Sequence, residues 1–87
     1  MTTIDINEIN AHTFKVTVTA GNTTEHVVNV DPAYAQKLTG GNMPAADLVK
    51  KSFEFLLERE SSNSILRSFD LGVINRYFPA YEREICK

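Results

Sequence analysis

The sequence has one cysteine, few glycines and no long hydrophobic run. A single cysteine, Cys86, excludes an internal disulfide, and we interpret it as an exposed or loosely packed thiol. No apolar stretch approaches the ~20 residues of a membrane-spanning helix. The first ten residues, MTTIDINEIN, have neither the basic start nor the apolar run of a signal peptide. These absences predict a cytoplasmic protein that does not associate with membranes.

A surplus of basic residues is also missing. The formal net charge is −2, from nine basic and eleven acidic residues. Residues 1–43 are acidic on balance, and residues 44–87 carry equal numbers of the two signs. Proteins that bind nucleic acid usually gather lysine and arginine on one face to neutralise phosphates. No segment here is of that kind, so nucleic-acid binding is not the leading expectation.

The residue sets that carry catalysis are absent from the sequence pattern. Of the two histidines, His12 falls in an expected loop, and His26 falls on the apolar face of an expected strand without a carboxylate beside it. The serines cluster in residues 61–68, where they are typical of caps and loops. The four glycines form no phosphate-binding motif. We therefore predict a protein that is not an enzyme, with no cofactor, no metal ion and no identifiable small-molecule ligand.

Length and composition describe a small globular protein. The chain has 87 residues, of which 43% are hydrophobic and 23% charged. One domain covering residues 1–87 is the natural expectation. A domain of this size buries only a little more than ~60% of its unfolded surface, so its core is thin and association with a second chain would stabilise it.

The N-terminal half has the pattern of an antiparallel hairpin. Residues 14–20, FKVTVTA, alternate apolar and polar side chains, and residues 24–30, TEHVVNV, are a second β-branched run. A three-residue loop over residues 21–23 would place Val18 opposite His26 and Phe14 opposite Val30, which separates apolar from polar faces. Residues 3–8 alternate as well and would add a third strand.

Two helices are expected next. Asp31-Pro32 predicts the start of a short helix over residues 32–38, because aspartate caps free backbone N–H groups and proline suits the first helical position. A longer helix is expected from Pro44 to about Glu60. Its apolar residues span roughly 200° at the ~100° per residue of a helix, which is wider than one core requires. We expect two contacts for it: the sheet, and either the C-terminal segment or the same helix of another subunit.

The stretch SILRSFDLGVINRYFPAYE, residues 64–82, has the apolar spacing of a packed element. Ser64 is expected to cap a short turn, and Asp70 to cap a helix over residues 71–78 that stops at Pro79. The predicted core is Phe14, Val16, Val18, Val28, Val30, Leu48, Phe53, Leu56, Leu66, Phe69, Ile74 and Phe78.

Two resemblances accompany this pattern. The runs SFEFLLERE, SILRSFDL and INRYFPAYE, within residues 52–82, are similar to a pattern found in short bacterial proteins of unknown function, which implies no activity. The order strand, short helix, longer helix over residues 24–60 resembles a ribbon-helix-helix domain, which implies strand-mediated dimerisation and binding in the DNA major groove. Against it, the outward residues Glu25, Val27 and Asn29 include no basic side chain.

The sequence thus predicts an α+β protein: a small antiparallel hairpin or three-stranded meander packed on one long helix, with short C-terminal helices. The function that we expect is non-enzymatic binding of a protein partner or self-association as a homodimer, with Phe55, Asn75 and Arg76 as contact residues. The alternative is a DNA-binding regulator or antitoxin-type protein of the ribbon-helix-helix kind.

Overall fold

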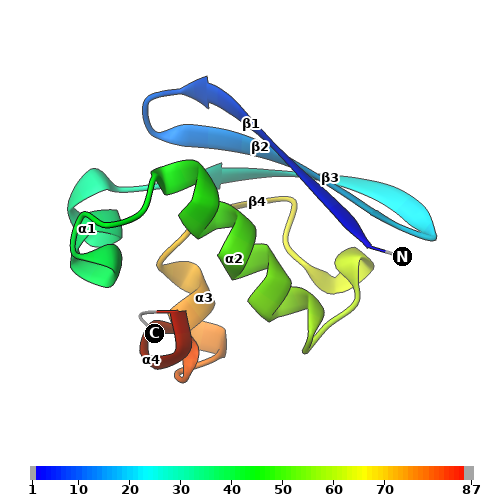
Figure 1. The fold of residues 1–87 in the computed structure, drawn as a ribbon. Helices are drawn as coiled ribbons and strands as arrows, with labels where there is room; N and C mark the ends of the chain where they lie inside the picture. The colour runs from blue at the N-terminus through cyan, green and yellow to red at the C-terminus, as the bar shows by residue number, and fades with distance from the viewer. Residues whose placement is uncertain (1, 86–87) are drawn as a thin grey trace.

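A computed structural model of the chain describes residues 2–85, and Cys86 lies outside them. One sheet has the strand order β1-β2-β3-β4, and the helices lie on one of its faces (Figure 1). The strands are β1 (Thr3–Asn10), β2 (Thr13–Ala20), β3 (Asn22–Asn29) and β4 (Ser68–Asp70). The helices are α1 (Pro32–Thr39), α2 (Ala45–Leu57), α3 (Val73–Tyr77) and α4 (Tyr81–Ile85), with a 3₁₀ turn at Ser62–Ser64.

The predicted α+β class is confirmed, but the sheet is larger and more mixed than predicted. The third strand expected over residues 3–8 is present as β1. A fourth strand, β4, pairs in parallel with β3, whereas β1, β2 and β3 form an antiparallel meander. The pairing of Val27 with Ser68 joins residues that are far apart in the sequence. The local sequence of a three-residue strand does not indicate such a long-range pairing, and β4 was therefore not predicted.

The β2–β3 hairpin has the predicted faces but not the predicted register. Val16 lies opposite His26, and Phe14 opposite Val28, two residues away from the expected pairing. Gly21 has a φ of 89°, and this single residue separates the paired residues Ala20 and Asn22. The turn is tighter than the three-residue loop that was expected because glycine adopts positive φ without steric cost. A shift of two residues keeps every side chain on its predicted face.

The ends of the two predicted helices are determined by the residues that lie there and by their local hydrogen bonds. The Asp31 side chain accepts a hydrogen bond of 3.0 Å from the Ala33 backbone N–H, and Pro32 is the first residue of α1. Gly40 ends α1 with a φ of 65°. Helix α2 is shorter than predicted, since it ends at Leu57 and the backbone N–H groups of Arg59 and Glu60 both bond to the Leu56 carbonyl oxygen in a closing turn.

Helix α2 packs against the sheet on one side and α4 on another, which explains its wide apolar arc. On the sheet side, the Phe53 ring lies 5.3 Å from the His26 ring and 6.0 Å from the Phe69 ring, measured between centroids. On the other side, the Phe55 ring makes an edge contact with Tyr81 of α4 at 5.4 Å. The expected second contact of this helix is therefore the chain's own C-terminal segment.

The predicted core is largely confirmed, with corrections in the C-terminal part. Leu66 is 47% exposed rather than buried, and Tyr77, which lies in the stretch with the spacing of a packed element, is 66% exposed. Asp70 does not cap a helix, because it pairs with Asn29 in the sheet and α3 begins only at Val73. Phe78 is half-buried, and Tyr81, which was not predicted, is fully buried.

Candidate functional site

The predicted contact residue Phe55 is not at the surface. It is only 7% exposed, and its ring is covered by Phe78, by Tyr81 and by the guanidinium of Arg59, whose carbon lies 3.7 Å from the ring centroid. The expectation of an exposed Phe55 is thus wrong. The sequence could not show this, because the C-terminal segment that covers Phe55 is more than 20 residues away along the chain.

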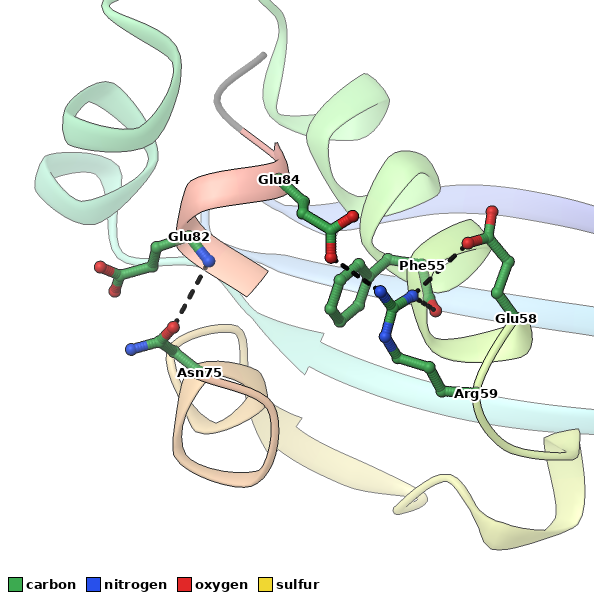
Figure 2. Close-up of polar contacts among 6 residues, drawn as sticks. All are labelled: Phe55, Glu58, Arg59, Asn75, Glu82 and Glu84. Carbon is green, nitrogen blue, oxygen red and sulfur yellow. Dashed lines mark hydrogen bonds and ion pairs between the residues drawn. The ribbon is translucent and has the colours of Figure 1, made fainter. Parts of the chain in front are cut away.

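A set of polar contacts fastens α4 over Phe55 (Figure 2). Arg59 donates to the Glu84 carboxylate at 2.7 Å and to the Phe55 carbonyl oxygen at 3.1 Å. Figure 2 also shows the longer contact of Arg59 with Glu58, at 3.4 Å. Since the same guanidinium stacks on the ring below it, this corner of the molecule is closed by its own side chains.

The two other predicted contact residues lie on α3. The Asn75 side-chain oxygen accepts a bond of 3.4 Å from the Glu82 backbone N–H, and this contact links α3 to α4 (Figure 2). Arg76 is exposed. The structure therefore places Asn75 and Arg76 together on one short helix, whereas Phe55 lies on α2 and is covered by α4.

His26 has the environment of a structural residue. It is 1% exposed, its Nδ1 lies 2.8 Å from the Leu66 carbonyl oxygen, and its Nε2 lies 2.9 Å from the Thr24 hydroxyl. Because the carbonyl oxygen can only accept, Nδ1 carries the proton in the neutral ring and Nε2 accepts from Thr24. Both nitrogens are satisfied, and the contact holds the segment before β4 against the sheet.

An apolar groove opens beside β4, on the helical side of the sheet. It has a volume of about 210 Å³ and lies between the end of α2, the segment that precedes β4, and α3. Its apolar lining consists of Leu56, Ile65, Leu66, Phe69, Val73, Ile74, Tyr77 and Phe78, with polar atoms from Glu60 and Ser64. We call this the β4 groove.

The rim of the β4 groove carries two exposed apolar side chains, Leu66 and Tyr77. Leu66 and Tyr77 belong to the three most exposed large hydrophobic residues in the described part of the chain, the third being Ile9. Leu66 comes from the segment before β4 and Tyr77 from α3, so they lie on two different walls. Apolar side chains that meet around a hollow are typical of interaction sites, whereas single exposed ones are not.

The sequence pattern indicates this groove only in part. The pattern assigns Leu66, Phe69, Ile74, Tyr77 and Phe78 to one packed element. These residues do line one groove, together with residues from the end of α2. The pattern could not separate the buried residues, such as Phe69 and Ile74, from the rim residues Leu66 and Tyr77. Whether a side chain is buried or lies at the rim depends on its position relative to β4, the last strand of the sheet.

A second, more polar hollow lies where β3 and β4 end. His12, Asn29, Asp31 and Asp70 line it, together with Tyr34. The Asp31 carboxylate is already engaged as the cap of α1, and the Tyr34 hydroxyl donates to Glu82 at 2.8 Å. Residues 2–85 bring together no group of three or more histidine, cysteine or acidic side chains suited to a metal ion. The hollow thus assembles polar residues without a recognisable reactive set.

The geometry that a ribbon-helix-helix domain needs is not present. Such a domain dimerises by pairing a free strand with its copy, but β3 is paired on one side with β2 and on the other with β4. On the outward face of the sheet, Lys15 is engaged by Glu25 at 3.3 Å. The strand expected to enter a DNA groove is therefore an interior strand.

None of the helices in the described residues has the length and apolar character needed to cross a membrane. Compared with known proteins, the chain matches no family model, no curated protein and no solved structure. Its function has to be inferred from its own geometry.

Proposed function

We propose that this chain is a non-enzymatic protein-binding module whose contact site is the β4 groove. The observation that carries the proposal is the apolar rim, where Leu66 is 47% and Tyr77 is 66% exposed over an apolar hollow. Leaving such side chains in water is unfavourable by roughly 25 cal/mol per Å² of apolar surface. A partner that covers them recovers this free energy.

The size of the groove favours a side chain as its occupant. Sites for small molecules and cofactors usually have volumes of about 300–1,000 Å³, and the β4 groove has about 210 Å³. It also contains few polar groups to orient a substrate, since Glu60, Ser64 and Tyr77 are the lining residues that bear polar side-chain atoms. An apolar side chain from a partner protein fits these properties better than a metabolite does.

The binding site replaces the predicted one but stays within the same part of the chain. Phe55 lies beneath α4 and takes no part. Asn75 and Arg76 lie on α3, the helix that also contributes Val73, Ile74 and Tyr77 to the groove. Arg76 is exposed and would lie at the margin of a bound partner, where charges influence the rate of association more than its strength.

The test uses a display library of random peptides selected against the purified protein. Peptides that share an apolar residue should be enriched and should bind the wild type at least tenfold more tightly than the variant Tyr77→Asp. Lys50→Asp, an exposed change on the outward side of α2, is the control and should leave the affinity unchanged. Circular dichroism shows whether each variant is folded. Selected peptides that bind Tyr77→Asp as well as the wild type would show that the groove is not the site.

A further inference from the structure

The partner segment is an extended strand

The open edge of β4 indicates how a partner segment is held at the groove. We infer that the partner contributes an extended peptide that pairs with β4 as a fifth strand and places an apolar side chain in the β4 groove. This inference rests on the proposed function. Addition of a strand to a sheet edge is a common mode of peptide recognition, in which main-chain hydrogen bonds give affinity and side-chain pockets give specificity.

The hydrogen bonds of β4 show which backbone groups face outward. The Val27 N–H donates to the Arg67 carbonyl oxygen at 2.7 Å, and the Leu71 N–H donates to the Asn29 carbonyl oxygen at 2.9 Å. In a strand, residues that bond to one neighbour alternate with residues whose N–H and C=O point the other way. Arg67 and Leu71 therefore face β3, and the intervening Ser68 and Asp70 direct their backbone groups away from it.

The position of the groove matches the side chains of such an added strand. Phe69 is 8% exposed and points to the helical side of the sheet, where its ring lies beside Phe53. A further strand would lie about 4.8 Å beyond β4, with every second side chain on the same side as Phe69. The β4 groove, which Phe69 helps to line, lies on that same side of the sheet. Ser68 and Asp70 are exposed on the opposite face.

The two edges of the sheet differ in a way that favours β4. The edge strand β1 has a register shift between Glu8 and Asn10, and it carries Asp5 and Glu8. Glu8 lies opposite Phe14, on the side of the sheet that faces the core, and yet it is exposed. Bulges and inward-facing charges are features with which proteins discourage strand addition. The edge strand β4 (Figure 1) is short, but its buried side chain is the apolar Phe69, and an apolar hollow lies beside it.

Glu60 adds a preference about the sequence of the bound segment. It is the charged member of the groove lining, and it takes part in none of the ion pairs among the described residues. Complementary charges across an interface favour correct partners and exclude wrong ones. The expected ligand is an extended segment with a large apolar residue and a basic residue near it.

The decisive experiment measures backbone pairing separately from groove binding. A groove-binding peptide from the display selection is added to the isotope-labelled protein, and hydrogen exchange of each amide is followed by NMR. The amides of Ser68 and Asp70 should become protected at least tenfold, with no comparable change in β1. In the peptide, N-methylation at every second residue should weaken binding by about two- to tenfold or more, because one hydrogen bond is lost at each.

A variant of the protein gives the reciprocal test. Ser68→Pro removes an outward N–H and leaves the bonds of Arg67 and Leu71 to β3 in place, so it should weaken peptide binding while the fold is retained. Ser61→Pro, in the loop before the 3₁₀ turn, is the matched control. If the peptide needs Tyr77 but neither protects Ser68 and Asp70 nor responds to N-methylation, strand addition is refuted and the groove proposal stands. If no selected peptide depends on Tyr77, both are refuted.

Discussion

The buried hydroxyl pair of Ser52 and Tyr81 offers a sharp test of how the C-terminal segment is attached. Both residues are 0% exposed, and their oxygens lie 2.6 Å apart. The Ser52 hydroxyl has one hydrogen, which it donates to the Leu48 carbonyl oxygen at 2.7 Å. The Tyr81 hydroxyl is therefore the donor in the pair, and this bond ties α4 to the middle of α2.

The expected cost of removing the bond follows from what is left behind. In Tyr81→Phe, Ser52 keeps its bond to Leu48, so no buried hydroxyl is orphaned there, and the loss should be that of one hydrogen bond, ~0.5–1.5 kcal/mol. A domain of this length has a total stability of roughly 4–13 kcal/mol. A loss of 1 kcal/mol lowers the melting temperature of so small a domain by about 4–8 °C.

A double-mutant cycle isolates this interaction. Tyr81→Phe, Ser52→Ala and the double variant are unfolded in urea and by heat, followed by circular dichroism. Ser52→Ala also gains up to ~0.7 kcal/mol of helix propensity, but this gain is present in both arms of the cycle and cancels. Groups in direct contact should show a coupling energy of about 0.5–1.5 kcal/mol. Tyr77→Phe makes the same chemical change on an exposed side chain and should alter stability by less than ~0.5 kcal/mol.

Two outcomes would refute this account of the C-terminal attachment. One is that Tyr81→Phe is no less stable than Tyr77→Phe. The other is that the effects of Tyr81→Phe and Ser52→Ala add within ~0.3 kcal/mol, which is the behaviour of distant, independent sites.

Two further predictions concern packing and backbone conformation. Phe69→Ala should destabilise the protein by ~3–5 kcal/mol, since Phe69 is 8% exposed. Leu66→Ala should cost less than ~1 kcal/mol because its side chain is 47% exposed. Equal losses of stability in urea unfolding would contradict the assignment of Leu66 to the rim. Gly40→Ala should cost ~1–2 kcal/mol because the residue has a φ of 65°. Gly72→Ala is the matched control, because Gly72 has a φ of −63° and an added Cβ would make only an ordinary contact with Tyr34 at 3.8 Å. This variant should be neutral or stabilising by up to ~1 kcal/mol. A Gly40→Ala variant as stable as Gly72→Ala in thermal unfolding would argue against the left-handed conformation at the end of α1.

The parts of the fold that were predicted well are those with a local physical cause. Alternation placed the β2 and β3 side chains on the correct faces, because neighbouring residues of a strand point to opposite sides. Asp31 and Pro32 predicted the start of α1, because the cap is formed by the residues themselves. The register was wrong by two residues because a shift of two residues leaves the apolar pattern unchanged, and the pattern therefore cannot choose between the two pairings.

The candidate site was predicted less well because exposure depends on distant segments. Phe55 lies at one edge of the helix's apolar arc and was expected to be a contact residue, but α4 folds back over it and Arg59 closes the corner. Leu66 was expected in the core, but it lies just before β4, and β4 is the last strand of the sheet in the described residues. In both cases the amphipathic pattern shows which side chains are apolar, but not which distant segment covers them or leaves them exposed.

The sequence by itself determined the class of the fold, the inward faces of the hairpin, the limits of α1 and the wide apolar arc of α2. These features depend on side-chain alternation, helix capping and helical periodicity, which act over a few residues. Only the tertiary structure decided that β4 joins the sheet, that α4 covers Phe55 and that a groove remains beside the last strand. Each of these depends on contacts between residues far apart in the chain, whose formation is governed by how the whole core packs and not by any one segment.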